Sequence, residues 1–221
     1  DFSTLTPEWL MIRSLLENCD KGILQQAHKA IEKVVSNQPV TEKKGCQIAL
    51  VGLRGAGKST LGRLLSVELG FPFIELSREV EQIAGCSIAE IQDLYGIDAY
   101  RRYERVALEQ AIQNHPEAII GIPGGLVSDS TNFKLLLSQC RTVWLKANPE
   151  DHMQRVIEQG DLRPMAGNAE AMKDLENILK SRNTFYSKAQ LQLDTSQQSL
   201  QATFDKLLNL IQNKLFLNEM S

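Results

Sequence analysis

The most constraining feature of this chain is a glycine-rich run between two apolar segments. It fits the pattern G-x-x-x-x-G-K-[ST] and reads Gly52-Leu53-Arg54-Gly55-Ala56-Gly57-Lys58-Ser59-Thr60. The apolar residues 47–51 before it predict a buried strand, and residues 59–69 after it predict a helix. Glycines let such a turn curl until successive backbone N–H groups point inward, toward a bound anion.

This strand–turn–helix unit predicts a site for a phosphate-bearing ligand. The helix N-terminus adds unpaired N–H groups and the positive end of its dipole. We expect Lys58 on the β- and γ-phosphates of this ligand and Ser59 on Mg²⁺, but the motif alone does not identify the ligand. The expected nucleotide-binding residues are Gly52, Arg54, Gly55, Ala56, Gly57, Lys58, Ser59 and Thr60.

A second metal ligand is expected at Glu75, which ends the next apolar segment. Carboxylate oxygens suit Mg²⁺, and the apolar segments at 118–122 and 142–145 do not end in Asp. The alternative is a solvated acid at the end of a strand.

Apolar segments alternate with amphipathic ones from Cys46 onward. Strands are expected at 47–51, 73–76, 118–122, 142–145 and 191–193. Helices are expected at 59–69, 78–84, 88–95, 99–114, 131–138, 149–159, 170–181 and 200–215. Strands separated by helices predict an α/β fold of three layers, in which helices cover both faces of a five-stranded parallel sheet.

The first part of the chain has a different pattern. Residues 1–45 predict a helical hairpin and a polar linker, and residues 46–221 the α/β domain. Two helices alone cannot bury their apolar faces, so we expect the hairpin to dock on this domain, on another domain or on a second copy, and the chain to form a homodimer. Because the sequence begins at Asp1, we expect it to be part of a longer protein.

Composition excludes several functions. With 24 Lys and Arg against 27 Asp and Glu, the net charge of −3 does not favour unaided nucleic-acid binding. The four cysteines and three histidines are scattered, which argues against a disulfide framework or a zinc site. No apolar run approaches the roughly 18 residues of a membrane span. We therefore expect a cytoplasmic protein without membrane contact.

Three arginines accompany the phosphate site. Arg101 begins a long helix, Arg163 lies in a polar loop between glycines, and Arg182 ends a helix. An arginine of this kind is, taken alone, more often structural than functional. We expect these three, however, in loops at the carboxyl edge of the parallel sheet, where such sheets bind ligands. Together the arginines suit a ligand with several anionic groups. If the chain is a kinase, Lys58 and Arg163 are its expected catalytic residues.

Residues 46–215 resemble the shikimate kinases, P-loop kinases that pass the ATP γ-phosphoryl to the 3-hydroxyl of shikimate. The matching motifs run in order: residues 52–60, 73–81, 85–91, Tyr100-Arg101 with Glu104, 123–125, 163–165, and Arg182 with Tyr186. The resemblance implies a P-loop kinase fold with ATP and Mg²⁺ as cofactors. It also implies ligand-binding roles for Ser77, Arg101, Pro123, Gly124, Gly125, Arg163 and Arg182.

Three positions depart from that family's pattern. Ser77 and Glu75 replace aspartates, and Pro123 replaces the first of three glycines. A serine cannot act as a base at ordinary pH or accept hydrogen bonds from two hydroxyls as a carboxylate does. Proline lacks an N–H donor and fixes φ. We therefore expect shikimate to be a poor substrate.

A finer resemblance, carried by residues 7–13 and 99–104, agrees with these departures. The whole chain is similar to the effector domain of benzoyl-CoA-responsive transcriptional regulators, in which an N-terminal helix-turn-helix domain, absent here, binds DNA. This resemblance predicts a sensor of benzoyl-CoA, or a similar aromatic acyl-CoA, that controls benzoate catabolism. The alternative is a kinase of shikimate or a related hydroxylated acid.

Overall fold

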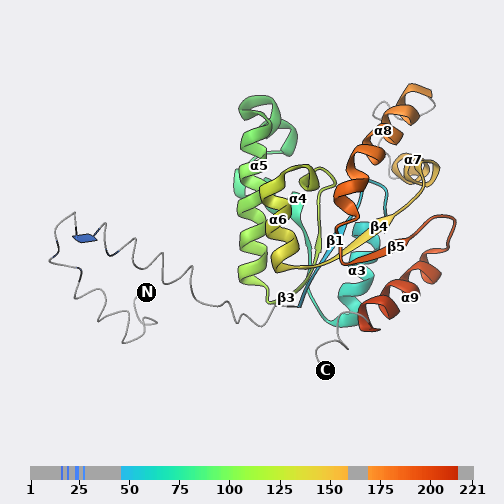
Figure 1. Cartoon of the computed structure of the whole chain (residues 1–221), viewed down its shortest axis with the longest axis horizontal. Helices are drawn as coiled ribbons and strands as arrows, with labels where there is room; N and C mark the ends of the chain where they lie inside the picture. Colours follow the sequence, from blue (N-terminus) through green and yellow to red (C-terminus); the bar gives the residue numbers. More distant parts are fainter. Residues whose placement is uncertain are drawn as a thin grey trace. The chain divides into compact units, whose positions relative to one another are not determined.

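A computed structural model shows five parallel strands in one sheet, in the order β2-β3-β1-β4-β5 (Figure 1). The strands are β1 (Cys46–Val51), β2 (Phe73–Glu75), β3 (Glu117–Gly121), β4 (Arg141–Lys146) and β5 (Leu191–Asp194). The structure describes residues 46–158 and 169–213, together with Leu16, Cys19, Ile23, Leu24 and Ala27. The expected α/β fold with a five-stranded parallel sheet is confirmed.

Helices cover both faces of the sheet (Figure 1). They are α3 (Lys58–Leu69), α4 (Leu76–Ala84), α5 (Ile88–Asn114), α6 (Ser130–Gln139), α7 (Pro149–Glu158), α8 (Ala169–Tyr186) and α9 (Leu200–Ile211), with a 3₁₀ turn η1 (Leu126–Ser128) before α6. Ile48 and Leu50 of β1 join the core formed with α3 and α9, whereas Ala49 and Val51 join the core formed with α4, α5 and α6. The alternation of side chains along a strand thus builds one core on each face.

The position of β1 at the centre of the sheet determines where a ligand can enter. β1 pairs with β3 on one side and with β4 on the other, so the connections after these strands diverge. The glycine-rich run leaves the carboxyl end of β1 at this point. The fold therefore puts this turn at the crevice where open parallel sheets bind ligands.

Two helix boundaries have identifiable causes. The expected helices at 88–95 and 99–114 are confirmed as the two parts of α5, because Gly96, with φ 78° and ψ 175°, breaks the helical geometry between them. Helix α8 extends past the expected end at residue 181 to Tyr186. The Tyr186 ring is buried and stacks on Trp144 at 5.7 Å between centroids, a packing that local sequence does not show.

The first 43 residues are assigned to a unit of their own. The chain divides into two compact units, residues 1–43 and 44–221. Leu16, Ile23, Leu24 and Ala27 are helical, and the rest of the expected hairpin lies outside the described residues. Its docking and the expected homodimer stay predictions. In the described parts of the chain, no helix is long and apolar enough to cross a membrane.

Candidate active site

The turn between β1 and α3, residues 52–57, has the backbone of a phosphate-binding loop. Gly52, Gly55 and Gly57 have φ values of 148°, 75° and 90°, in the region that residues with a side chain rarely adopt. The space is also restricted, because a methyl group on Gly52 would lie 2.5 Å from the carbonyl oxygen of Leu145. Glycine is therefore required here both by backbone conformation and by close packing.

Lys58, the first residue of α3, folds back over this loop. Its Nζ donates to the carbonyl oxygens of Gly52 and Leu53, both at 2.9 Å. Burial lowers the pKa of Lys58 to about 8, and the negative charge of Glu75 only partly opposes this effect. Since a bound phosphate would stabilise the ammonium form, the site is electrostatically prepared for an anion.

Ser59 and Glu75 form the expected metal pair. The Ser59 hydroxyl donates to Glu75 Oε1 at 2.6 Å, and Arg63 Nη2 lies 3.8 Å from Glu75 Oε2. Hydroxyl and carboxylate oxygens are hard ligands that fit Mg²⁺, which in kinases takes its other ligands from phosphates and water. The described residues contain no group of three or more His, Cys, Asp or Glu that could hold a metal by itself. The donor set thus fits Mg²⁺ brought in with a nucleotide.

A second glycine turn, Pro123-Gly124-Gly125, lies against the phosphate-binding loop. A methyl group on Gly124 would lie 3.1 Å from the carbonyl oxygen of Gly52. The Gly124 carbonyl accepts a hydrogen bond from the Tyr186 hydroxyl at 2.8 Å. The turn that follows β3 is thereby fixed beside the turn that follows β1.

Arg101 of α5 and Arg182 of α8 converge at this second turn. A methyl group on Gly125 would lie 3.3 Å from Arg101 Nη2 and 3.9 Å from Arg182 Nη2. These residues are 81 positions apart in sequence, and the fold brings their guanidinium groups to one glycine. Two guanidinium groups at one point are well suited to bind a carboxylate.

A buried carboxylate orients Arg101. Glu104 has no exposed surface and forms an ion pair with Arg101 Nη1. Burial raises the pKa of Glu104, and hydrogen bonding to Arg101 opposes this shift. Asn132 Nδ2 also donates to the Arg101 carbonyl at 2.9 Å, which holds the backbone of α5. The Arg101 side chain is therefore pre-positioned before any ligand binds.

The remaining predicted residues have different positions. Ser77 is half-buried near the start of α4, two residues after Glu75, and Thr60 is exposed on α3. Arg163 lies outside the described residues. The sequence prediction assigned no role to Glu104. Its position three residues after Arg101 on a helix nevertheless predicts an ion pair between the two side chains. It also missed His152 and Arg155, which contact the phosphate-binding loop.

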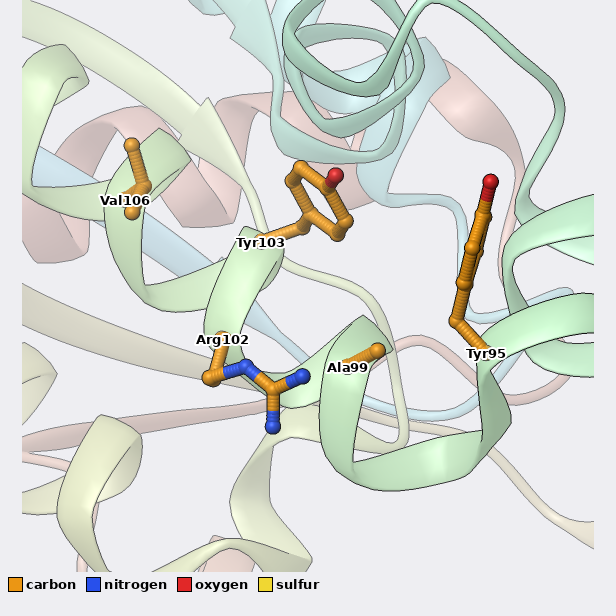
Figure 2. A pocket seen from close by; sticks show the side chains of 5 residues that line it. All are labelled: Tyr95, Ala99, Arg102, Tyr103 and Val106. Atoms are coloured by element: carbon orange, nitrogen blue, oxygen red, sulfur yellow. The ribbon is translucent and has the colours of Figure 1, made fainter.

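A cavity of about 250 Å³ lies elsewhere, along α5 (Figure 2). Figure 2 shows the side chains that line it: Tyr95, Ala99, Arg102, Tyr103 and Val106. Ala99, Arg102, Tyr103 and Val106 follow Gly96 in one helical stretch, where 3.6 residues per turn centre them roughly opposite Arg101. The cavity is therefore not part of the phosphate-binding site.

Comparisons with known proteins agree with this geometry. The family model for shikimate kinase matches residues 54–212. The chain belongs to the shikimate kinase family. Shikimate kinase of Zymomonas mobilis is 33% identical over 161 residues, which cover 73% of this chain and 90% of the relative. That of Parasynechococcus marenigrum is 33% identical over 171 residues, 77% of this chain and 88% of the relative.

Solved shikimate kinases share the fold. The Acinetobacter baumannii enzyme, determined in complex with shikimate, aligns with a TM-score of 0.68 at 30% identity and covers 77% of this chain and 95% of its own. The Bacteroides thetaiotaomicron enzyme also gives 0.68, at 26% identity, covering 78% of this chain and 99% of its own.

These relatives correct the functional prediction. The prediction that this domain senses benzoyl-CoA for a transcriptional regulator is wrong, because relatives at 30–33% identity over most of the chain are shikimate kinases. The prediction gave most weight to Ser77 and Pro123. The convergence of Arg101 and Arg182 beside the phosphate-binding loop, which depends on the fold, agrees better with a kinase that has a donor site and an anionic acceptor site.

Replacement of Gly55 by alanine tests the geometry of the loop. A methyl group there would lie 2.7 Å from the His152 carbonyl oxygen at a φ of 75°. Gly70→Ala is a matched control, because φ is 71° and nothing lies within 4 Å. We expect Gly70→Ala to lower the free energy of unfolding by about 1 kcal/mol and Gly55→Ala to lower it by an additional ~1–3 kcal/mol. Denaturant unfolding measures both, and equal losses would contradict the packing described here.

Proposed function

We propose that this protein transfers the γ-phosphoryl group of ATP to a hydroxyl of shikimate. The observation that carries the proposal is the position of the Arg101–Arg182 pair at Gly125, next to a complete phosphate-binding loop. Shikimate carries one carboxylate and several hydroxyls. A carboxylate held by the two arginines keeps the ring beside the loop, where a hydroxyl can reach the terminal phosphate.

The donor side uses the loop and the start of α3. Backbone N–H groups of residues 54–59 and the Lys58 ammonium bind the β- and γ-phosphates. Lys58 has to exchange its carbonyl acceptors, Gly52 and Leu53, for phosphate oxygens. Ser59 and Glu75 would hold Mg²⁺, which neutralises charge on the transferring group.

The acceptor side uses α5, α8 and the turn after β3. Arg101, oriented by Glu104, and Arg182 bind the carboxylate and thereby orient the ring. Because the transition state of phosphoryl transfer is loose, catalysis depends mainly on positioning and charge stabilisation. The half-buried Ser77 offers a single hydroxyl near the start of α4. A serine there can orient the acceptor but does not accept its proton.

Shikimate-dependent release of ADP, with identification of a phosphorylated shikimate by mass spectrometry, tests the proposal. We expect turnover that requires both Mg²⁺ and shikimate and that is abolished in Lys58→Met. If the protein binds ADP but forms no phosphorylated shikimate at millimolar substrate, the proposed acceptor is wrong.

Removal of one arginine should affect the acceptor selectively. We expect Arg182→Met to raise KM for shikimate by at least about tenfold, because charged hydrogen bonds contribute about 1.5–3 kcal/mol. KM for ATP should change little. Lys180→Met removes one positive charge from an exposed position of α8 and serves as the control. An equal rise in both KM values for Arg182→Met would show that Arg182 does not act on the acceptor.

Introduction of a carboxylate at position 77 should increase activity. A carboxylate in the first turn of α4 is favoured by the helix dipole and can accept the hydroxyl proton. We expect Ser77→Asp to raise kcat/KM for shikimate by about 100-fold, the lower end of the range for general base catalysis. Steady-state kinetics beside Ser77→Ala measure the effect. A Ser77→Asp enzyme no faster than Ser77→Ala would mean that position 77 does not reach the acceptor.

A further inference from the structure

The carbonyl groups of the phosphate-binding loop need hydrogen-bond donors of their own. When backbone N–H groups turn inward toward an anion, the carbonyl oxygens of the same residues turn outward into protein. Two of these carbonyls, on Arg54 and Gly55, face α7. His152 Nδ1 lies 2.8 Å from the Arg54 oxygen, and Arg155 Nη1 lies 3.4 Å from the Gly55 oxygen. Each contact joins residues about 100 positions apart in sequence.

The ring of His152 is held in one protonation state. The side chain is 1% exposed, and desolvation lowers the pKa of His152, which favours the neutral ring. The Arg54 carbonyl can only accept, so Nδ1 must carry the proton of the neutral imidazole. His152 is therefore a fixed donor toward the loop.

Arg155 is anchored on its other side to the sheet. Its Nη1 donates to Thr195 Oγ1 at 3.0 Å, and its Nη2 donates to the Thr195 carbonyl at 2.7 Å. Thr195 N in turn donates to the Lys146 carbonyl at the end of β4, at 2.8 Å. The contact to Gly55 is thus connected to the sheet. The backbone of α7 also fits closely, since a methyl group on Gly55 would lie 3.1 Å from Val156 Cγ2.

We propose that His152 is a positioning residue for the nucleotide, which holds the Arg54 carbonyl outward so that the neighbouring N–H groups face the phosphates. Arg155 gives the same support at Gly55. The His152 side chain does not contact the nucleotide in this role. The inference rests on the proposed function only in that the loop binds a nucleotide.

A series of replacements at His152 separates this role from packing. The amide nitrogen of asparagine lies close to the position of Nδ1, the amide nitrogen of glutamine lies near that of Nε2, and leucine has no donor. We expect His152→Leu and His152→Gln to weaken ADP binding by about tenfold, the loss of one hydrogen bond. His152→Asn should restore binding to within about threefold of the original protein. Isothermal titration of the 221-residue chain with ADP measures the affinities.

Gln154→Ala, at an exposed position of the same helix, is the control and should bind ADP normally. Unchanged affinity in His152→Leu would overturn the proposal, as would equal weakening in the leucine, asparagine and glutamine variants. If His152→Leu does not fold, the comparison of His152→Gln with His152→Asn replaces it, and unchanged affinity in His152→Gln is equally decisive. A protein that binds ADP but does not phosphorylate shikimate would refute only the proposed acceptor, whereas absence of ADP binding would refute both.

Discussion

The turn from β1 to α3 must arrange backbone N–H groups around an anion, and much of the surrounding structure follows from this requirement. Three glycines adopt left-handed or extended conformations with positive φ because no side chain fits there. The outward carbonyls then need donors, and His152 and Arg155 are such donors in the described structure. The backbone hydrogen bonds of loop residues 52–57 thus constrain which side chains α7 carries.

The parallel sheet brings the two proposed substrate sites together. Because β1 lies next to β3, the glycine turn after β3 lies against the phosphate-binding loop, with Gly124 close to Gly52. Helices α5 and α8 then bring Arg101 and Arg182 to Gly125. The proposed anion site for the acceptor is therefore adjacent to the proposed anion site for the donor, which is the arrangement that phosphoryl transfer requires.

Local patterns in the sequence predicted the strands and the phosphate-binding loop, whereas the contacts that support the loop join residues far apart in sequence. Apolar segments predicted all five strands, and the motif at 52–60 predicted the loop, because both depend on neighbouring residues. The contacts of His152 and Arg155 join side chains to backbone carbonyls far away in sequence, and no local pattern shows them. The mistaken sensor prediction weighted two substitutions, Ser77 and Pro123, whose effect depends on a pocket that only the fold assembles.

The most direct measurement of the central claim is a crystal structure of the protein with shikimate and a non-hydrolysable ATP analogue. The account predicts the shikimate carboxylate between Arg101 and Arg182 beside Gly125, with a ring hydroxyl directed at the terminal phosphate in the loop of residues 52–57. A complex in which the nucleotide fills that loop while the carboxylate binds away from both arginines would contradict it.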